Sequence, residues 1–151
     1  MTNTNYDEIE ILLVEDNMSD AELTIRALAK AGIANHLFHV KDGSEALDFI
    51  FFKGEYAGRR TKSNPKLVLL DIKMPKIDGI DVLRKIKQDE KTKMIPVVIM
   101  TSSRQEQDIV SSYKLGVNAY VVKPVDFEGF SKAVRHLGLF WLLVNQPPPG
   151  L

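Results

Sequence analysis

Short runs of apolar residues alternate along the chain with longer segments whose apolar positions recur every three or four residues. The apolar runs predict five β-strands, at 9–14, 34–40, 66–70, 95–100 and 118–122. Three of them are apolar almost throughout, which is typical of a parallel sheet covered on both faces. The periodic segments predict five helices, at about 19–32, 44–53, 80–89, 105–115 and 127–144. This alternation indicates an α/β fold with a doubly wound parallel sheet.

The first predicted helix carries a recognisable start signal. Ser19 is followed three residues later by Glu22, the spacing of a capping box, and the apolar stripe of this helix ends near Gly32. We therefore expect the helix to begin at Ser19.

The composition narrows the class of protein. The 151 residues are 44% hydrophobic, enough for one domain with a proper core. Twenty basic and twenty acidic residues cancel, so no overall field draws the protein to nucleic acid or to an anionic membrane. There is no cysteine, signal-peptide pattern or long apolar run. We expect a cytoplasmic protein that binds neither nucleic acid nor membrane.

Polar residues follow four of the predicted strands at the point where each strand ends. They are Glu15 and Asp16 after the first strand, Asp71 after the third, Thr101, Ser102 and Ser103 after the fourth, and Lys123 after the fifth. The carboxyl ends of parallel strands meet at one edge of the sheet, where ligands bind. Three carboxylates together raise one another's pKa values unless a cation lies among them. Oxygen ligands suit Mg²⁺, which commonly brings phosphate with it.

Most of these polar residues, and Tyr120 on the last predicted strand, also have a purely structural interpretation. The alternatives are helix caps for Glu15, Asp16, Thr101 and Ser102, a packing aromatic for Tyr120 and a surface lysine for Lys123.

Four segments resemble the receiver domains of two-component response regulators. They are LLVEDN at 12–17, DIKMPKIDG at 71–79, MTSS at 100–103 and YVVKP at 120–124. The segments occur in the family's order, and the resemblance covers about 9–144. It implies a flavodoxin-like (βα)5 fold with strand order 2-1-3-4-5. More narrowly, 111–130 and 138–149 resemble the single-domain regulators that partner phytochrome histidine kinases.

The resemblance implies a role for each residue at the strand ends. Asp71 would be the phosphoacceptor. Mg²⁺ or Mn²⁺ would be held by Glu15, Asp16, Asp71 and the backbone carbonyl of Lys73. Lys123, Thr101, Tyr120 and Ser102 would bind the phosphoryl group and carry the conformational change that follows phosphorylation. The protein would be a signalling protein that catalyses only its own phosphorylation and dephosphorylation.

The C-terminal part of the chain predicts a contact with a second protein. Apolar residues on the last predicted helix occupy more than one face, and we expect a homodimer with Phe140, Trp141 and Leu143 as interface candidates. The predicted organisation is an N-terminal tail at 1–8, a receiver domain at 9–144 and a proline-rich tail at 145–151, with no output domain.

The long segment 51–66 carries a basic cluster of Arg59, Arg60 and Lys62. We expect a solvated, mobile excursion rather than a docking site, although long loops are often functional.

Three further function classes are weighed against the receiver. An aspartyl-nucleophile phosphatase would need a second Asp two residues after Asp71, where this chain has Lys73. A flavodoxin-like phosphate-binding module would need a Ser/Thr/Gly-rich turn after the first strand, where this chain has acids. A receiver that acts as a scaffold without phosphorylation is the remaining alternative.

Overall fold

The computed structural model describes residues 11–30, 36–59, 64–102 and 104–123. Five parallel strands form one sheet in the order β2-β1-β3-β4-β5. The strands are β1 (Ile11–Val14), β2 (Leu37–Val40), β3 (Leu67–Leu70), β4 (Val97–Thr101) and β5 (Ala119–Val122). The helices are α1 (Met18–Lys30), α2 (Gly43–Ile50), α3 (Gly79–Gln88), α4 (Glu106–Lys114) and a short 3-10 helix, η2 (Gly54–Tyr56). The predicted fold class and strand order are confirmed.

The remaining predicted elements lie outside the described residues. These are the helix at 127–144, both tails, and the interface candidates Phe140, Trp141 and Leu143.

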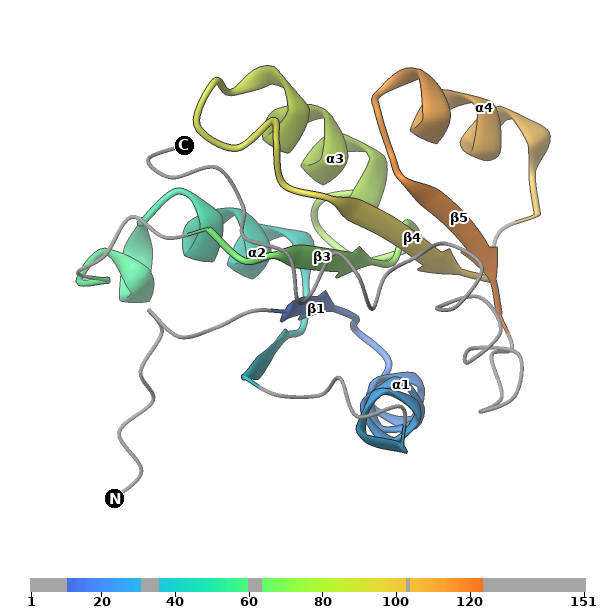
Figure 1. Cartoon of the computed structure of the whole chain (residues 1–151), viewed down its shortest axis with the longest axis horizontal. Helices are drawn as coiled ribbons and strands as arrows, with labels where there is room; N and C mark the ends of the chain where they lie inside the picture. The colour runs from blue at the N-terminus through green and yellow to red at the C-terminus, as the bar shows by residue number, and fades with distance from the viewer. Residues whose placement is uncertain (1–10, 31–35, 60–63, 103, 124–151) are drawn as a thin grey trace.

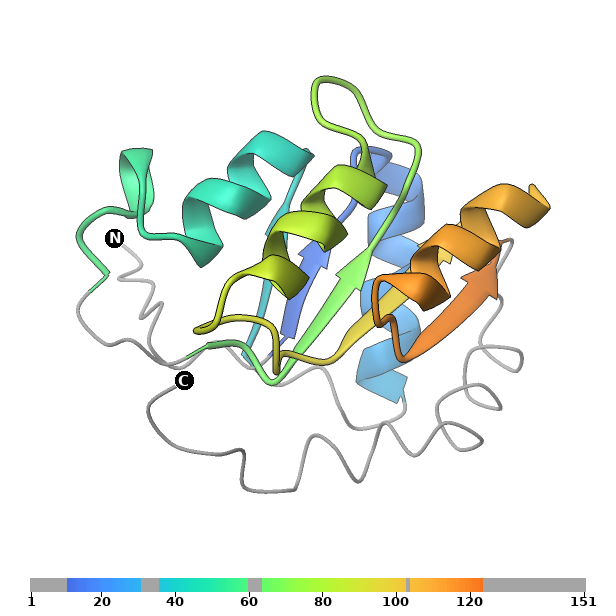
Figure 2. The ribbon, with the colours of Figure 1, turned by 90° about the horizontal axis from the view of Figure 1, so that it is seen from above.

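The helices cover both faces of the sheet, with α1 on one face and α2, α3 and α4 side by side on the other (Figures 1 and 2). Alternate strand residues supply the two cores. Leu12 and Val14 pack on the side of α2 and α3, while Ile11 and Leu13 pack with Leu28 of α1. Strands that are buried on both faces are apolar at nearly every position, and this is why the strands could be predicted from apolar runs in the sequence.

The start of α1 differs from the prediction. The helix begins at Met18, and the side chain of Asn17 accepts a hydrogen bond of 3.0 Å from the backbone N–H of Asp20. Ser19 therefore lies inside the first turn, and the predicted capping box with Glu22 is wrong. Asn is as good a cap as Ser, and Asn17 lies two residues before Ser19 in the chain.

Two alternative cap assignments are also excluded. Asn17, rather than Glu15 or Asp16, caps α1. Helix α4 begins at Glu106, and its N-cap residue Gln105 makes no side-chain cap hydrogen bond.

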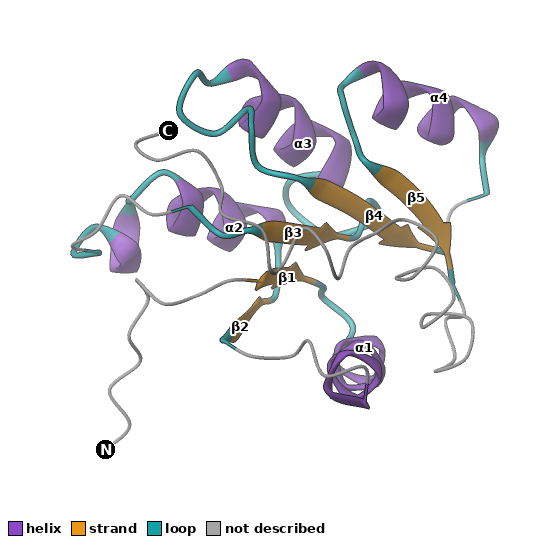
Figure 3. Ribbon diagram, viewed as in Figure 1, coloured by secondary structure: helices purple, strands orange, loops and turns teal. Residues whose placement is uncertain are grey.

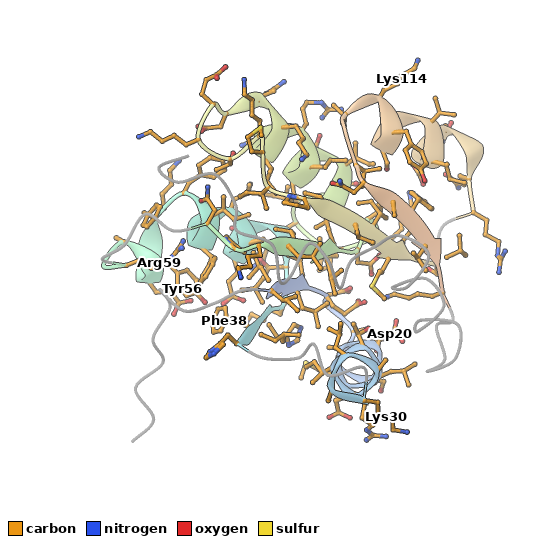
Figure 4. All side chains as sticks on the ribbon, viewed as in Figure 1. Asp20, Lys30, Phe38, Tyr56, Arg59 and Lys114 are labelled. Atoms are coloured by element: carbon orange, nitrogen blue, oxygen red, sulfur yellow. The ribbon has the colours of Figure 1, made fainter. Side chains whose placement is uncertain are left out.

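The segment after α2 is held by aromatic packing (Figure 4). The guanidinium of Arg59 donates to the backbone carbonyl of Phe49 and lies 4.0 Å and 4.3 Å from the ring centroids of Phe49 and Phe52. Arg59 is buried. The expectation that Arg59 belongs to a solvated basic cluster is therefore wrong, because cation–π contacts hold it inside.

Helix α3 approaches the loop after β3 at Gly79, where only a glycine fits. An ideal Cβ at this position would overlap the backbone carbonyl of Asp71 and lie 2.6 Å from Cα of Ile72. The N–H of Gly79 donates to the carbonyl of Ile72 at 2.8 Å. This contact brings the start of α3 against the loop that follows β3, which Figure 3 draws in teal between the two elements.

We predict that Gly79→Ala destabilises the protein by about 3 kcal/mol or more, since the colliding atoms belong to the backbone and cannot rotate away. Gly58→Ala is the matched control, because a Cβ at Gly58 meets nothing within 4 Å. Its stability should stay within about 0.5 kcal/mol of wild type. Urea unfolding of the three proteins measures the difference, and equal stabilities for both variants would contradict the close approach.

Candidate functional site

Strands β1 and β3 deliver two acidic side chains to the same point. Val14 pairs with Leu70 in the parallel register, so Glu15 and Asp71 leave the sheet side by side. The backbone N–H of Asp71 donates to the carbonyl of Val14 at 3.1 Å. The strand order reverses direction between β1 and β3, and ligands bind at such switch points of open α/β sheets.

Three carboxylates form a compact cluster at this point. Glu15, Asp16 and Asp71 can each offer an oxygen such that the three atoms lie within 4.8 Å of one another. Glu15 and Asp71 are buried and Asp16 is exposed. Hard oxygen donors at this spacing, open to water on one side, fit a divalent cation such as Mg²⁺ or Mn²⁺. Of the residues proposed from the sequence as metal ligands, the structure brings these three together.

Lys123 reaches the cluster from the end of β5. Its Nζ forms an ion pair with Glu15 and contacts Asp20 Oδ2 at 2.9 Å and Asp71 Oδ2 at 3.4 Å. The backbone N–H of Lys123 donates to the carbonyl of Thr101 at 2.8 Å, which places the lysine beside the end of β4. One half-buried ammonium is therefore shared by three carboxylates, which follow β1, follow β3 and lie in the first turn of α1.

Asp20 is the member of this group that the sequence analysis missed. It lies in the first turn of α1, four residues after Asp16. Asp16 precedes the helix, so this spacing alone does not place Asp20. The available signal was an acid in the first turn of a helix that begins just past the end of β1, where its side chain can reach the carboxylate cluster.

The pKa values follow from burial and crowding. Burial raises the pKa of Glu15 to about 7, although the hydrogen bond from Lys123 lowers it. The nearby charge of Asp71 adds to the increase. Burial lowers the pKa of Lys123, but hydrogen bonds to Glu15 and Asp20 and the charge of Asp71 outweigh burial and hold it above its ordinary value.

A histidine forms a hydrogen bond with the backbone beside the carboxylate cluster. Nε2 of His39, on β2, lies 2.7 Å from the backbone carbonyl of Glu15. A carbonyl only accepts hydrogen bonds, so Nε2 is the donor. No sequence pattern pointed to His39, because its partner is a backbone atom.

The other residues predicted for the site differ in how deeply they are buried. Thr101 is fully buried at the end of β4, and Ser102 is exposed directly after it. Tyr120 is half-buried and packs against the core on the side of α2 and α3. The N–H of Lys73 donates to Asp71 Oδ1 at 3.3 Å, and its ammonium lies 3.4 Å from Asp108 on α4.

The part of the chain that the structure describes contains no helix long and apolar enough to cross a membrane.

Comparison with known proteins gives one family. Residues 11–135 match the model of the response regulator receiver domain. Response regulator Rcp1 of Synechocystis is 40% identical over 132 residues, which are 87% of this chain and 88% of Rcp1. The crystal structure of the Mn²⁺-bound form of Rcp1 has a TM-score of 0.76, at 39% identity, and covers 91% of this chain and 97% of that chain.

Two further solved structures are similar over most of their length. The bacteriophytochrome response regulator AtBRR is 52% identical with a TM-score of 0.75, covering 92% of this chain and 99% of its own. The phosphorylated cyanobacterial phytochrome response regulator RcpA is 40% identical with a TM-score of 0.77, covering 91% and 96%. On the match to the family model and on these identities, this chain belongs to the response regulator receiver domain family.

Proposed function

We propose that this protein is a response regulator that accepts a phosphoryl group on Asp71 from a sensor histidine kinase and signals by a change in its protein contacts. The observation that carries this proposal is the position of the Asp71 carboxylate. It is largely buried at the switch point of the sheet, beside Glu15 and within 3.4 Å of the Lys123 ammonium.

The chemistry assigned to Asp71 is nucleophilic attack on phosphorus. A carboxylate oxygen forms the new O–P bond while the P–N bond of a phosphohistidine breaks, and the electron pair of that bond stays on the imidazole. The product is an acyl phosphate on Asp71. The reaction depends mainly on alignment and on neutralising the phosphoryl charge, and Lys123 is the cation best placed among the described residues to pair with a phosphoryl oxygen.

We assign Glu15, Asp16, Asp71 and the backbone carbonyl of Lys73 as the groups that hold Mg²⁺ or Mn²⁺. The bound ion would supply positive charge that offsets the charge of the phosphoryl oxygens. The compact three-carboxylate cluster supports this assignment, as does the Mn²⁺-bound form of the relative Rcp1.

Thr101, Ser102 and Tyr120 are assigned to the response. Added phosphoryl oxygens are strong hydrogen-bond acceptors. Thr101 ends β4, which pairs with the strand that leads to Asp71, and Ser102 follows it. Rearrangement of Tyr120, which lies on β5 opposite Ile99 of β4, would carry the change to the surface of α4 and β5. A homodimer through Phe140, Trp141 and Leu143 remains part of this proposal.

The proposed kinase is of the phytochrome type. Support comes from AtBRR and RcpA, whose names connect them with bacteriophytochrome and cyanobacterial phytochrome. A phytochrome histidine kinase should phosphorylate this protein much faster than an unrelated histidine kinase does, measured with the phosphorylated kinases at equal concentration. Equal rates would remove the support for this partner.

An aspartyl-nucleophile phosphatase is less well supported. The position two residues after Asp71 holds Lys73, whose ammonium pairs with Asp108. A lysine there cannot supply the carboxylic acid that such an enzyme uses to protonate its leaving group.

We predict that wild-type protein incubated with Mg²⁺ and acetyl phosphate gains one phosphoryl group and that Asp71→Asn gains none, because the amide is not a nucleophile for phosphorus. Intact mass spectrometry measures the gain. Asp81→Asn, an exposed carboxylate on α3 paired with Arg84, is the control and should be modified like wild type.

Circular dichroism should show all three proteins folded. A folded wild type that binds Mg²⁺ but gains no mass would favour the scaffold alternative, and modification of Asp71→Asn would place the phosphoryl group elsewhere.

We further predict that Mg²⁺ affinity depends on pH through Glu15. The pKa of Glu15 is raised to about 7 without metal, and Mg²⁺ binds the carboxylate form. Below pH 7 each Mg²⁺ must therefore displace a proton, and the affinity should fall by up to about tenfold per pH unit, while above pH 7 it should level off.

Titration calorimetry near pH 6 and pH 8 measures this effect. Glu15→Gln should bind more weakly, with nearly the same affinity at both pH values. A wild-type affinity that does not change with pH would contradict the raised pKa of Glu15.

A further inference from the structure

The Lys123 ammonium has one partner outside the candidate metal cluster, and that partner is Asp20. The cluster consists of Glu15, Asp16 and Asp71. Lys123 touches two members of the cluster and, in addition, Asp20 on α1. An ammonium has three N–H donors, so these three carboxylates can use all of them.

The contact to Asp20 is the better of the two contacts with aspartates. The Nζ–Oδ2 distance is 2.9 Å to Asp20 and 3.4 Å to Asp71, and charge-assisted N–H···O bonds are strongest at about 2.7–2.9 Å. The Lys123 side chain is 11% exposed and the Asp20 side chain 41% exposed. Asp20 thus lies at the outer rim of the pocket and draws the ammonium toward that rim.

Asp20 itself is held in place by the start of α1. Its N–H donates to the side chain of Asn17 at 3.0 Å, and its carbonyl accepts a hydrogen bond of 2.9 Å from the hydroxyl of Thr24. The carboxylate therefore projects from a capped first turn whose backbone is fixed.

A divalent cation and Lys123 would compete for the same oxygens. Both are positively charged, and both need Glu15 and Asp71. If Lys123 had only these two partners, each bound metal ion would leave a buried ammonium with weakened pairing, which is costly. Asp20 offers the ammonium a partner that the metal does not use.

We propose that Asp20 is a positioning residue that keeps Lys123 at the rim of the pocket, so that Glu15 and Asp71 can bind a divalent cation while Lys123 stays within reach of Asp71. This inference rests on the metal site of the proposed function. It adds a fourth carboxylate that acts through the lysine and not on the metal.

The test is a double-mutant cycle on Mn²⁺ affinity, followed by the electron paramagnetic resonance signal of free Mn²⁺. The variants are Asp20→Asn, Lys123→Met and their combination. About 0.5 M salt reduces the screening length to roughly 4 Å, which suppresses the long-range effect of removing a negative charge.

We expect Asp20→Asn to weaken Mn²⁺ binding about fivefold or more while Lys123 is present. In the Lys123→Met background the same change should alter the affinity less than about twofold, because no ammonium remains to compete. Glu22→Gln, an exposed carboxylate two residues further along α1, is the control for net charge and should bind Mn²⁺ like wild type. Lys123→Gln replaces Lys123→Met if the latter does not fold.

Three outcomes would overturn the inference. An equal loss of affinity in both backgrounds would mean that Asp20 acts directly on the metal ion, and no loss in either would mean that Asp20 does not position Lys123. Absence of Mn²⁺ binding by wild type would overturn both this inference and the proposed metal site. Binding that follows the expected cycle in a protein that gains no phosphoryl group would contradict only the proposed phosphorylation.

Discussion

At the carboxyl ends of the strands, negatively charged side chains outnumber positively charged ones, and the rest of the site depends on this imbalance. Glu15, Asp20 and Asp71 share the ammonium of Lys123, and Asp16 lies in one cluster with Glu15 and Asp71, so four carboxylates gather near one ammonium among the described residues. Burial makes this imbalance matter, because Glu15 and Asp71 have little water to stabilise their charges. Burial, together with the charge of Asp71, raises the pKa of Glu15, and hydrogen bonds to Glu15 and Asp20 with the charge of Asp71 raise the pKa of Lys123. A site with this excess of negative charge is stabilised by additional positive charge, which is why a divalent cation suits it.

The fold creates this crowding without a special local motif. Parallel pairing of β1 with β3 places Glu15 and Asp71 next to each other, and pairing of β4 with β5 brings Lys123 to the same edge. Helix α1 begins three residues after Glu15, so its first turn brings Asp20 to the pocket as well. Charged residues that are far apart in the sequence thus meet because the strands carrying them are uninterrupted and apolar.

The sequence predicted the site residues that directly follow strands. It missed the side chains whose positions depend on contacts with other elements. Glu15, Asp71 and Lys123 could be placed because the end of a buried apolar run is visible in the sequence. Asp20 was missed because its direction depends on where α1 starts, and the start was predicted at Ser19, whereas Asn17 caps the helix. Arg59 was assigned to solvent because long polar segments usually are, whereas packing between Phe49 and Phe52 is a tertiary contact without a local pattern. The paths of His39 and Lys73 likewise depend on partners in other elements.

The contact at Gly79 has a consequence for how this site tolerates substitution. The acidic pocket requires charge, and charge can be supplied by either Asp or Glu, as Glu15 beside Asp16 illustrates. Position 79 requires the absence of side-chain volume, because the backbone of Asp71 and Ile72 already fills that space. No exchange among the acids can compensate for a methyl group there. A chain that kept every acid and the lysine but carried a larger residue at this position would have the charges of the pocket without its shape.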